Sequence, residues 1–545
     1  MNEMSANPMS GAHDHAADTM VMVMGGVPLG LYLAAVGAVI LLSFVATEWL
    51  GPRFSWSGTN RSLAGPRRRF DLTRSRRVHG WLRSRWFQAV PQMTMVAIFL
   101  FLIYVGLFGS RVRNLTPTAV WTLWWAGLIF AVLVLGSAWC FLCPWDGLAN
   151  LISRLRVVAR VDTLSLGLRF PRWLENTYPA LLLFALLTWL ELGFSVTTDP
   201  RATAYLGLAM AAMAITAALL WDGKRFCAHF CPVGRICGIY SSFSPIEIRS
   251  RKQRSCDACT TEDCLHGNEL GYPCPTGLSL KNLDTSVMCT MCTECFKSCR
   301  KHNVAVNLRP LGADLLESHG ATSGRGPAVD QAWLAVMLLA LTLFHGLSMT
   351  SLWQTFEPGR WSLLKWMGRV FGTPQSVSFT LAMGLAVALP VAVYAASCHL
   401  AARWAEAGAL RVDGRRLFTA FAYSLLPVAL FYHLAHNLMH LLAEGGEVVP
   451  LLGDPMGRGA DWLSLREVHV GALASDETLW IGQVLLVVAG HVFGILAAHR
   501  VAHRLYPDRR AATRSLVPLT ALMVLLSVAG LSLMHMDMNM RMGRM

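Results

Sequence analysis

Long apolar runs recur along almost the whole of this 545-residue chain, and they constrain its fold more than any other feature. A helix of about 20 apolar residues spans the hydrocarbon layer of a bilayer and satisfies its own backbone hydrogen bonds there. Only 15% of the residues are charged, against about 25% in soluble domains. We therefore expect an all-α polytopic membrane protein with about ten transmembrane helices, at roughly 27–46, 88–109, 117–138, 175–195, 203–221, 331–352, 377–397, 417–443, 479–498 and 515–534.

The formal net charge of +14 is distributed unevenly among the loops. Segment 47–87 contains ten Arg and the loop at 499–514 contains five, whereas segment 444–478 contains seven acidic residues against two Arg. Because positively charged loops stay in the cytoplasm, this alternation explains the charge by topology and argues against nucleic acid as a partner. Ten spans then place both termini on the periplasmic side of a bacterial inner membrane.

The first apolar run follows a polar segment that is rich in His and Met. This segment lacks the cationic start of a signal peptide. We therefore expect the first run to be retained as a transmembrane helix.

Eight of the fourteen Cys lie between 256 and 299, in a polar insert that the topology places in the cytoplasm. Reducing conditions there disfavour disulfides, so dense cysteine indicates metal binding. The last four have the spacing C-x2-C-x2-C-x3-C, which is typical of ferredoxins with two clusters, where a remote Cys completes each cluster. Zinc is the alternative, but such close spacing favours iron–sulfur. We expect two [4Fe–4S] clusters, one on Cys256, Cys259, Cys264 and Cys299 and the other on Cys274, Cys289, Cys292 and Cys295.

Two further cysteine pairs end in proline, and each follows a hairpin of two predicted spans. The sequences are "CFLCP" and "CAHFCP", so the first membrane half contains an internal repeat. The four thiols can converge on a metal or a cluster, form exchangeable disulfides, or simply pack at helix ends. These thiols are Cys140, Cys143, Cys227 and Cys231, whereas we interpret the single thiols Cys237 and Cys398 as packing residues.

In combination, two C-x2/3-C-P motifs after transmembrane hairpins and a two-cluster ferredoxin segment resemble the NapH/NosR/CcoG (FixG, RdxA) group of membrane iron–sulfur proteins. The resemblance covers about 88–300. It implies electron transfer through the cytoplasmic membrane, either from quinol towards periplasmic reductases or in copper handling during oxidase assembly. The chain departs from this group because five further spans follow the insert, where the CcoG type has a soluble β-domain.

Five histidines lie within the later predicted spans. Ionisable residues inside a membrane are costly and are therefore candidates for function. Facing helices can use such imidazoles as axial ligands of haem b, the same side chains can bind copper, or they can form interhelical hydrogen bonds. Clusters at the cytoplasmic face need an intermediate centre to pass electrons through a layer about 30 Å thick, which favours a cofactor. The candidates are His345, His433, His436, His440 and His491.

Both ends of the chain carry His and alternating Met outside the predicted spans. Thioether sulfur suits Cu(I), and imidazole suits either copper state. The alternative is a tail of low complexity in which Met is incidental. The candidate copper ligands are His13, His15, Met536, Met538 and Met540.

The chain thus divides into six segments: a His- and Met-rich N-terminus (1–26), a first membrane half of five spans (27–240), the ferredoxin-like insert (241–310), a linker (311–330), a second membrane half of five spans (331–534) and a Met-rich tail (535–545). No residue pattern indicates a general base or a nucleophile.

We expect a membrane-bound iron–sulfur protein that passes electrons across the membrane to a periplasmic acceptor, which is a metalloprotein reductase or copper. Its donor is quinol or a cytoplasmic ferredoxin or flavoprotein, and its activity would be that of a quinol dehydrogenase or a cupric reductase. The alternative is a copper-handling assembly factor that reduces copper for insertion into an oxidase or reductase.

Overall fold

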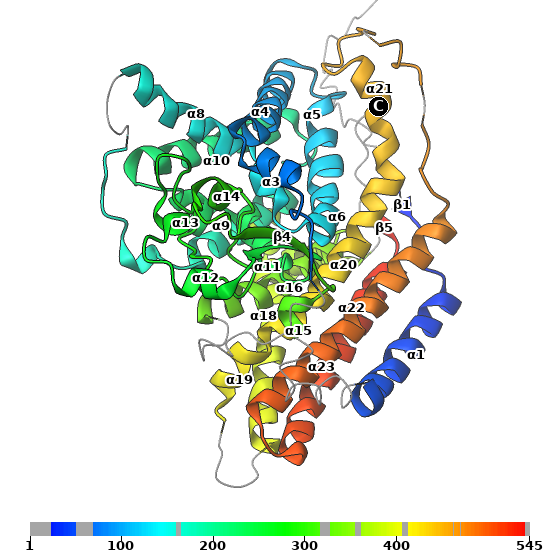
Figure 1. Ribbon diagram of the computed structural model, residues 1–545. Coiled ribbons are helices and arrows are strands. Elements are labelled where there is room, and N and C mark those ends of the chain that lie inside the picture. Colours follow the sequence, from blue (N-terminus) through cyan, green and yellow to red (C-terminus); the bar gives the residue numbers. More distant parts are fainter. Residues whose placement is uncertain are drawn as a thin grey trace, which may run out of the picture.

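The computed structural model describes residues 23–50, 69–159, 165–316, 328–354, 361–405, 412–461, 463–468 and 470–539. Within these residues the chain is mostly helical, and long helices pack side by side around a small segment of short helices and strands (Figure 1). The predicted copper ligands His13, His15 and Met540 lie outside the described residues.

Nine helices in the described part of the chain are long and apolar enough to cross a membrane, which confirms the multi-pass helical class. The fourth of the ten expected spans forms α9 (Tyr178–Gly193), whose 16 residues fall short of the usual spanning length. The nine are α1 with η1 (Leu29–Glu48), α4 (Arg85–Phe108), α5 to α6 (Leu115–Leu135), α10 (Pro200–Leu220), α16 (Val329–Ser348), α18 (Gln375–Trp404), α19 to α21 (Gly414–Gly453), α22 (Asp476–Leu505) and α23 (Arg509–His535).

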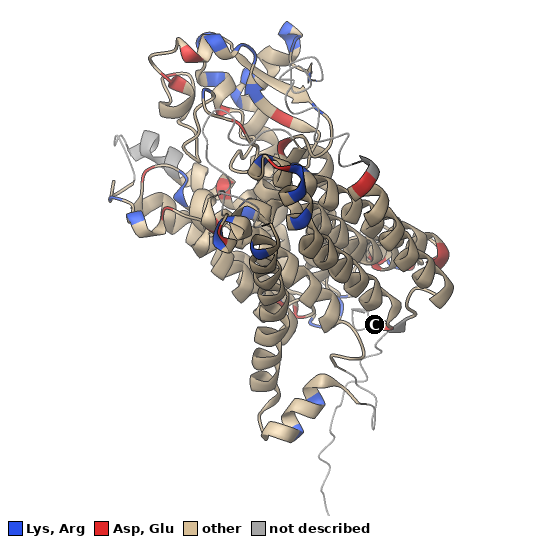
Figure 2. Cartoon of the chain, turned by 90° about the horizontal axis from the view of Figure 1, so that it is seen from below, with Lys and Arg blue, Asp and Glu red and all other residues tan. Residues whose placement is uncertain are grey.

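Two of these helices form the centre of the bundle. In the most apolar window of α16, 72% of the residues are buried, and in Gly414–Gly453 the share is 83%, against 22–33% for the spans formed by α1, α4, α5 to α6, α10 and α18. Figure 2 shows charged residues mainly in the insert, at helix ends and in connecting segments, while long stretches of helix carry none. The outer helices therefore present apolar surface suited to lipid, and the central ones hold the buried polar groups discussed below.

The two Cys-Pro motifs have the same local plan. The first hairpin is followed by α7 (Ala138–Leu142), Cys143 and α8 (Pro144–Ala159), and the second by η6 (Phe226–Phe230), Cys231 and α11 (Pro232–Tyr240). Proline at the first helical position loses no hydrogen bond, because that N–H has no partner within the helix. Cys231 caps α11, since its Sγ accepts a hydrogen bond from Gly234 N at 3.3 Å. Each motif thus ends one helix and begins the next.

The segment between the two membrane halves contains a three-stranded antiparallel sheet of order β2-β4-β3. Strand β2 comes from the Arg-rich segment before α4, and α3 of that segment packs against α14. The elements are β2 (Phe70–Asp71), α3 (Arg76–Arg83), β3 (Ile246–Ser250), α12 (Gln253–Asp257), α13 (Asp263–His266), α14 (Glu294–Ser298) and β4 (Val304–Leu308).

A buried network of ion pairs attaches this sheet to the helices. Arg309 Nη1 lies 2.9 Å from Glu247 Oε2, and neither side chain has exposed surface. Arg249 Nη2 lies 3.1 Å from Asp314 Oδ1, and Arg309 also contacts Asp314. Arg309 Nη2 donates a hydrogen bond to the carbonyl oxygen of Ser241, just after α11, at 3.1 Å. We call this end of the bundle the insert end.

The opposite end is closed by two loops that lie against each other. Ser110 N donates to Met456 O at 2.7 Å, and Arg113 Nη2 donates to Arg466 O at 3.3 Å. We call this end the loop end. The insert end and the loop end are the two ends of the helix bundle, and the positions of the sites described below are given relative to them.

Two shorter features bear on the predicted segments. Helix α15 (Ala313–Leu316) supplies Asp314 to the ion-pair network, although we expected residues 311–330 to be a linker, of which 317–327 lie outside the described residues. Strands β1 (Val23–Met24) and β5 (Met538–Asn539) pair antiparallel and join the two ends of the chain.

The ion-pair network predicts a specific loss of stability. Arg309→Ala leaves Glu247 and Asp314 buried with fewer partners, and breaking a buried pair in this way costs about 3–5 kcal/mol. The control Arg251→Ala removes a partner from Asp71, which is partly exposed, and should cost about 1 kcal/mol or less. Thermal unfolding in detergent, followed by protease sensitivity of the insert, measures both; equal losses would contradict the assigned role of Arg309.

Candidate functional site

Short helices and tight turns position the eight cysteines of the insert. Cys256 lies in α12, Cys264 in α13 and Cys295 in α14. Non-glycine residues with left-handed backbone, among them Glu262 and Thr293, lie directly before α13 and α14. These turns direct successive cysteines inward instead of along one helix face.

The structure gathers one set of thiols beside α12 and α13. Cys264 and Cys299 pack against buried Cys256 in one core of the insert. Burial raises the pKa of the Cys256 thiol, and the thiols of Cys299 and Cys259 raise it further. Asn303 supports the set, because its Nδ2 lies 3.2 Å from Cys256 Sγ. These four cysteines are the first set predicted from the spacing.

A second set surrounds a small cavity beside α14. Burial is the main cause that raises the pKa of the Cys295 thiol, and the thiols of Cys292, Cys289, Cys274 and Cys264 raise it further, which shows that they lie near it. The same five residues line the cavity, whose volume is about 30 Å³. Cys264 thus connects the two sets. Within the described residues, no three His, Cys, Asp or Glu side chains are arranged to hold a single metal ion.

The four thiols of the Cys-Pro motifs also come together, and a fifth joins them. Burial raises the pKa of the Cys143 thiol, with further contributions from Cys231 and Cys140. Burial is the main cause that raises the pKa of the Cys227 thiol, and Cys140 and Cys143 raise it further. The strongest influence on Cys140 is a hydrogen bond with Cys237, which raises its pKa. We call these five thiols the junction site.

Charged groups surround the junction site. Arg235 on α11 is only 2% exposed, and its charge lowers the pKa of the Cys140 and Cys231 thiols against the raising effect of burial. Its Nη1 lies 2.6 Å from Met288 Sδ, but its Nε and Nη2 are buried and have no hydrogen-bond partner among the described residues. On another side, Lys224 Nζ pairs with Asp146 Oδ2 at 2.7 Å.

The junction site lies next to the second set of insert thiols. Burial raises the pKa of the Cys289 thiol to about 11, and Cys140 contributes to this increase. The pKa of the Cys292 thiol is raised to about 12, mainly by burial, and the charge of Lys224 counteracts part of this increase. The three groups of thiols therefore form a series from the insert to the end of the membrane helices.

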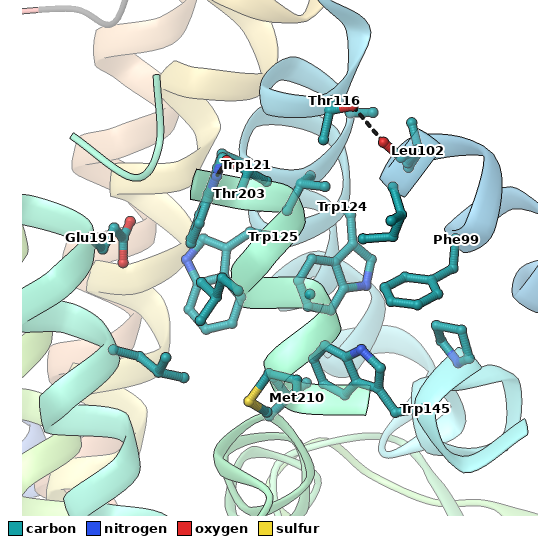
Figure 3. A pocket seen from close by; sticks show the side chains of 18 of the residues that line it. Phe99, Leu102, Thr116, Trp121, Trp124, Trp125, Trp145, Glu191, Thr203 and Met210 are labelled. Carbon is teal, nitrogen blue, oxygen red and sulfur yellow. Dashed lines mark hydrogen bonds between the residues drawn. The ribbon is translucent and has the colours of Figure 1, made fainter. Parts of the chain in front are cut away.

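An apolar cavity of about 250 Å³ begins beside the junction site. Its lining includes Pro144 and Pro232, the residues that directly follow Cys143 and Cys231, and it extends to Glu191 and Thr116 near the loop end. Figure 3 shows the rings of several tryptophans facing this space, with Glu191 at its side. The aromatic lining residues are Phe99, Trp121, Trp124, Trp125, Trp139, Trp145 and Phe184.

Five tryptophans line the cavity, and their indole nitrogens differ in whether they have a hydrogen-bond partner. Trp121 Nε1 donates to Thr203 Oγ1 at 3.0 Å. The indole nitrogens of Trp124, Trp125, Trp139 and Trp145 are buried without a hydrogen-bond partner in the described part of the chain. These four nitrogens have almost no accessible surface, so the walls that the cavity offers to an occupant are apolar, and the cavity suits an apolar molecule.

Three of the five predicted histidines form a row with two carboxylates. The rings of His345 and His436 have centroids 4.8 Å apart, and those of His436 and His440 are 5.2 Å apart. His345 Nε2 lies 3.7 Å from Glu191 Oε1, and His440 Nδ1 lies 3.2 Å from Glu444 Oε2. We call these five residues the histidine row.

The other two histidines have different surroundings. His433 Nδ1 lies 3.3 Å from the hydroxyl of Tyr240. Both ring nitrogens of His491 are hydrogen-bonded to hydroxyls, Nε2 to Ser43 at 2.7 Å and Nδ1 to Ser527 at 2.9 Å. His491 therefore makes interhelical hydrogen bonds, which were one of the three alternatives for the membrane histidines. To ligate a haem, His491 would have to break one of these two hydrogen bonds.

The two tail residues that the structure describes lie beside the start of the chain. Met538 is buried and pairs with Met24 across β1 and β5, and Met536 is partly buried just before it. The ring of His535 stacks on Tyr32 with centroids 4.9 Å apart. The paired strands thus bring residues of both Met-containing ends of the chain together.

Comparison with protein-family models, with curated proteins and with solved structures found no match. The functional argument therefore depends on the chain's own residues and on the motifs quoted above.

Sequence reasoning missed several residues of the site. Cys237 was interpreted as a packing residue, yet it contacts Cys140. Cys237 lies six residues after Cys231, and this spacing is not typical of metal ligands. Arg235 lies between them in an otherwise apolar stretch, and this charge could have indicated a site at this position. Glu191 was another such clue, because it is an acidic residue within an apolar span.

The pKa values predict how the insert thiols react in protein freed of metal by a chelator. The pKa of Cys259 is lowered, chiefly by a backbone hydrogen bond from Glu262, whereas that of Cys292 is about 12. Since the thiolate is the nucleophile, iodoacetamide at about pH 8 should modify Cys259 roughly a thousandfold faster. Raising the pH by two units should speed Cys292 about a hundredfold and Cys259 much less. Mass spectrometry of peptides measures both rates, and buried Cys398 serves as the unreactive control.

Proposed function

We propose that this chain is a membrane-bound iron–sulfur electron-transfer protein related to the NapH/NosR/CcoG group. Two [4Fe–4S] clusters in the insert exchange electrons, through the junction site, with a carrier in the aromatic cavity. From there the electrons continue towards an acceptor on the predicted periplasmic side, a metalloprotein reductase or copper. The contacts define a route, and the potentials of its two ends set the direction of flow.

The grouping of the insert thiols supports the two clusters. Zinc needs its ligands within about 2.3 Å of one point. A cubane spreads its four ligands, because each binds a different iron. Five thiols, Cys264 among them, line one small cavity, which supports a cubane on Cys274, Cys289, Cys292 and Cys295. The spacing and the buried Cys256 support the other, on Cys256, Cys259, Cys264 and Cys299. When bound, the clusters supply one-electron transfer.

The observation that carries the proposal is the buried guanidinium of Arg235 beside the junction thiols. A buried charge without a partner costs several kcal/mol, so the site favours an anionic occupant. Thiolates that hold a metal or a cluster are anionic, whereas neutral thiols or a disulfide are not. The residues of the junction site therefore fit a third redox group better than a packing role.

The aromatic cavity fits a quinone-type carrier. A quinone has an apolar ring and is soluble in lipid, and both properties match the apolar walls of the cavity. Ile98 lines the cavity and is 44% exposed on the outer side of α4, which gives access from the lipid. A quinol bound here would lie between the junction site and the histidine row. Ferredoxin or flavoprotein can then exchange electrons at the insert.

The remaining step to the periplasmic side stays a prediction. A haem b or copper bound by the membrane histidines outside the histidine row, His433 and His491, would provide the centre that the thickness of the membrane requires. The iron count described next tests this step as well.

The first test is the iron content and optical spectrum of the anaerobically purified protein. Two cubanes require about eight iron atoms per chain, and the broad absorption should bleach on reduction. Cys292→Ala should remove about four of them, because it deletes a ligand of the second set only. The matched control Cys398→Ala changes a buried cysteine of α18 and should lose none.

The same samples separate the alternatives. An unchanged iron content in Cys292→Ala, or zinc in place of iron, would overturn the proposal. Sharp bands of reduced haem b, with additional iron, would assign the histidines to haem. About four iron atoms above two cubanes, without haem bands, would place a third cluster at the junction site.

A second candidate function, copper handling during assembly of an oxidase or reductase, is favoured by the pairing of Met24 with Met538. This pairing brings the two Met-containing ends of the chain to one place, where soft sulfur ligands suit Cu(I).

Met538→Leu tests copper handling, because it keeps the volume and removes the sulfur. We expect at least a tenfold weaker Cu(I) affinity in competition with a chromophoric chelator, and unchanged affinity in Met523→Leu, which alters a buried Met of α23. Lost copper binding together with lost maturation of the recipient enzyme would favour delivery. Unchanged electron transfer in Met538→Leu would favour the electron route.

A further inference from the structure

We propose that the histidine row, Glu191, His345, His436, His440 and Glu444, is a proton path between the aromatic cavity and the loop end. The inference rests on the proposed function, because it assigns the protons of the quinone-type carrier in that cavity. It adds a second activity, the release or uptake of protons on the side of the membrane opposite the insert.

The path begins at the wall of the cavity. Glu191 is the one residue with an ionisable side chain among the described residues that line it. It is 8% exposed, and its Oε1 lies 3.7 Å from Nε2 of His345 on α16. A carboxylate at this position can accept a proton from a bound quinol and pass it to the imidazole.

Three imidazoles continue the path through the centre of the bundle. The rings of His345, His436 and His440 follow one another at centroid distances of 4.8 Å and 5.2 Å, and all three are at most 7% exposed. An imidazole accepts a proton at one nitrogen and releases one from the other, so it can relay protons without moving its backbone. The three rings come from two helices, α16 and the α20–η8 helix (Leu426–Glu444).

The path ends at a second carboxylate beside the loops. His440 Nδ1 lies 3.2 Å from Glu444 Oε2, which also accepts a hydrogen bond from Thr122 Oγ1 at 3.3 Å. Glu444 ends η8, and Glu447, three residues later, is partly exposed. His345 lies 16 residues beyond Val329, or about 24 Å along α16 from the insert end. The row therefore leads away from the insert towards the loop end.

Five ionisable side chains in the apolar centre of a bundle are costly to bury. Polar side chains that merely hold helices together can do so as a single local set, as His491 does with Ser43 and Ser527. The histidine row instead makes consecutive contacts from a ligand-sized cavity to Glu444, a buried carboxylate three residues before the partly exposed Glu447. That continuity is what a proton path requires and what helix packing does not.

The electron route through the junction site and the proton path along the histidine row together account for the electrons and protons of quinol oxidation. Oxidation of one quinol to the quinone breaks two O–H bonds and yields two electrons and two protons. When bound, two oxidised cubanes in the insert would accept these electrons by way of the junction site, one electron each. The protons pass to Glu191 and along the row to the loop end. Reduction of a quinone reverses both routes.

The test uses the full chain in vesicles, with the insert facing the medium and a pH-sensitive dye in the lumen. A short-chain quinol is the donor, and impermeant ferricyanide in the medium is the oxidant, which takes one electron and no proton. We expect the lumen to gain about two protons per quinol oxidised by the protein. Vesicles without protein control for direct oxidation, which acidifies the medium only.

Two variants interrupt the row at different places. Glu191→Gln keeps the shape of the side chain but cannot carry a proton, and His440→Gln interrupts the row near its end. Each should lower proton release into the lumen at least tenfold per electron transferred while retaining the iron of the insert. His499→Gln, which changes a buried histidine of α22 outside the row, should release protons as the unchanged protein does.

The outcomes separate the path from the function on which it rests. Lumen acidification that is the same in both variants, or haem or copper bound by the row, would overturn the path and leave the electron route intact. A quinol that fails to reduce the clusters of the unchanged protein would contradict the proposed function, and the path with it. Iron content checks that each variant is folded.

Discussion

A buried positive charge beside five thiols is the constraint on which the rest of the structure depends. Arg235 lies at the start of α11, between the membrane helices and the insert, and water does not reach its guanidinium. A charge in such a place is stable only with negative charge close to it. Under the proposed function, the junction thiols supply this charge as thiolates that hold a bound group. The two Cys-Pro motifs and the neighbouring insert thiols are positioned around this requirement.

From this point a continuous series of polar groups runs through an otherwise apolar bundle. On one side, the network of Arg309, Glu247 and Asp314 fixes the insert against the end of α11. On the other side, the aromatic cavity leads from Pro232 to Glu191, where the histidine row begins. The outer helices carry almost none of these groups. The buried polar groups thus lie inside the bundle, and the outer helices present a surface suited to lipid.

Much of the architecture followed from local pattern. The apolar runs located the helices, because a membrane requires about 20 apolar residues in a row whatever lies beside them. The one exception is α9, where Gly193 ends the helix after 16 residues. The cysteine spacing predicted two sets of thiols, and this division stays a prediction, because Cys264 of the first set also lines the cavity of the second. The histidines were located but not paired: His433 and His440 share a helix face, yet one contacts Tyr240 and the other Glu444.

The sequence by itself determined the helical membrane class, and it supplied the candidate residues for the proposed redox groups. Only the tertiary structure decided which of these residues contact one another. Cys237 joins Cys140, Glu191 joins His345, and His491 turns to two serines, because each contact connects segments that the sequence leaves independent. The physical reason is that hydropathy and spacing act along the chain, whereas burial, cavity walls and ion pairs arise between helices. The aromatic cavity shows this most clearly, since its walls come from six separate stretches of the chain.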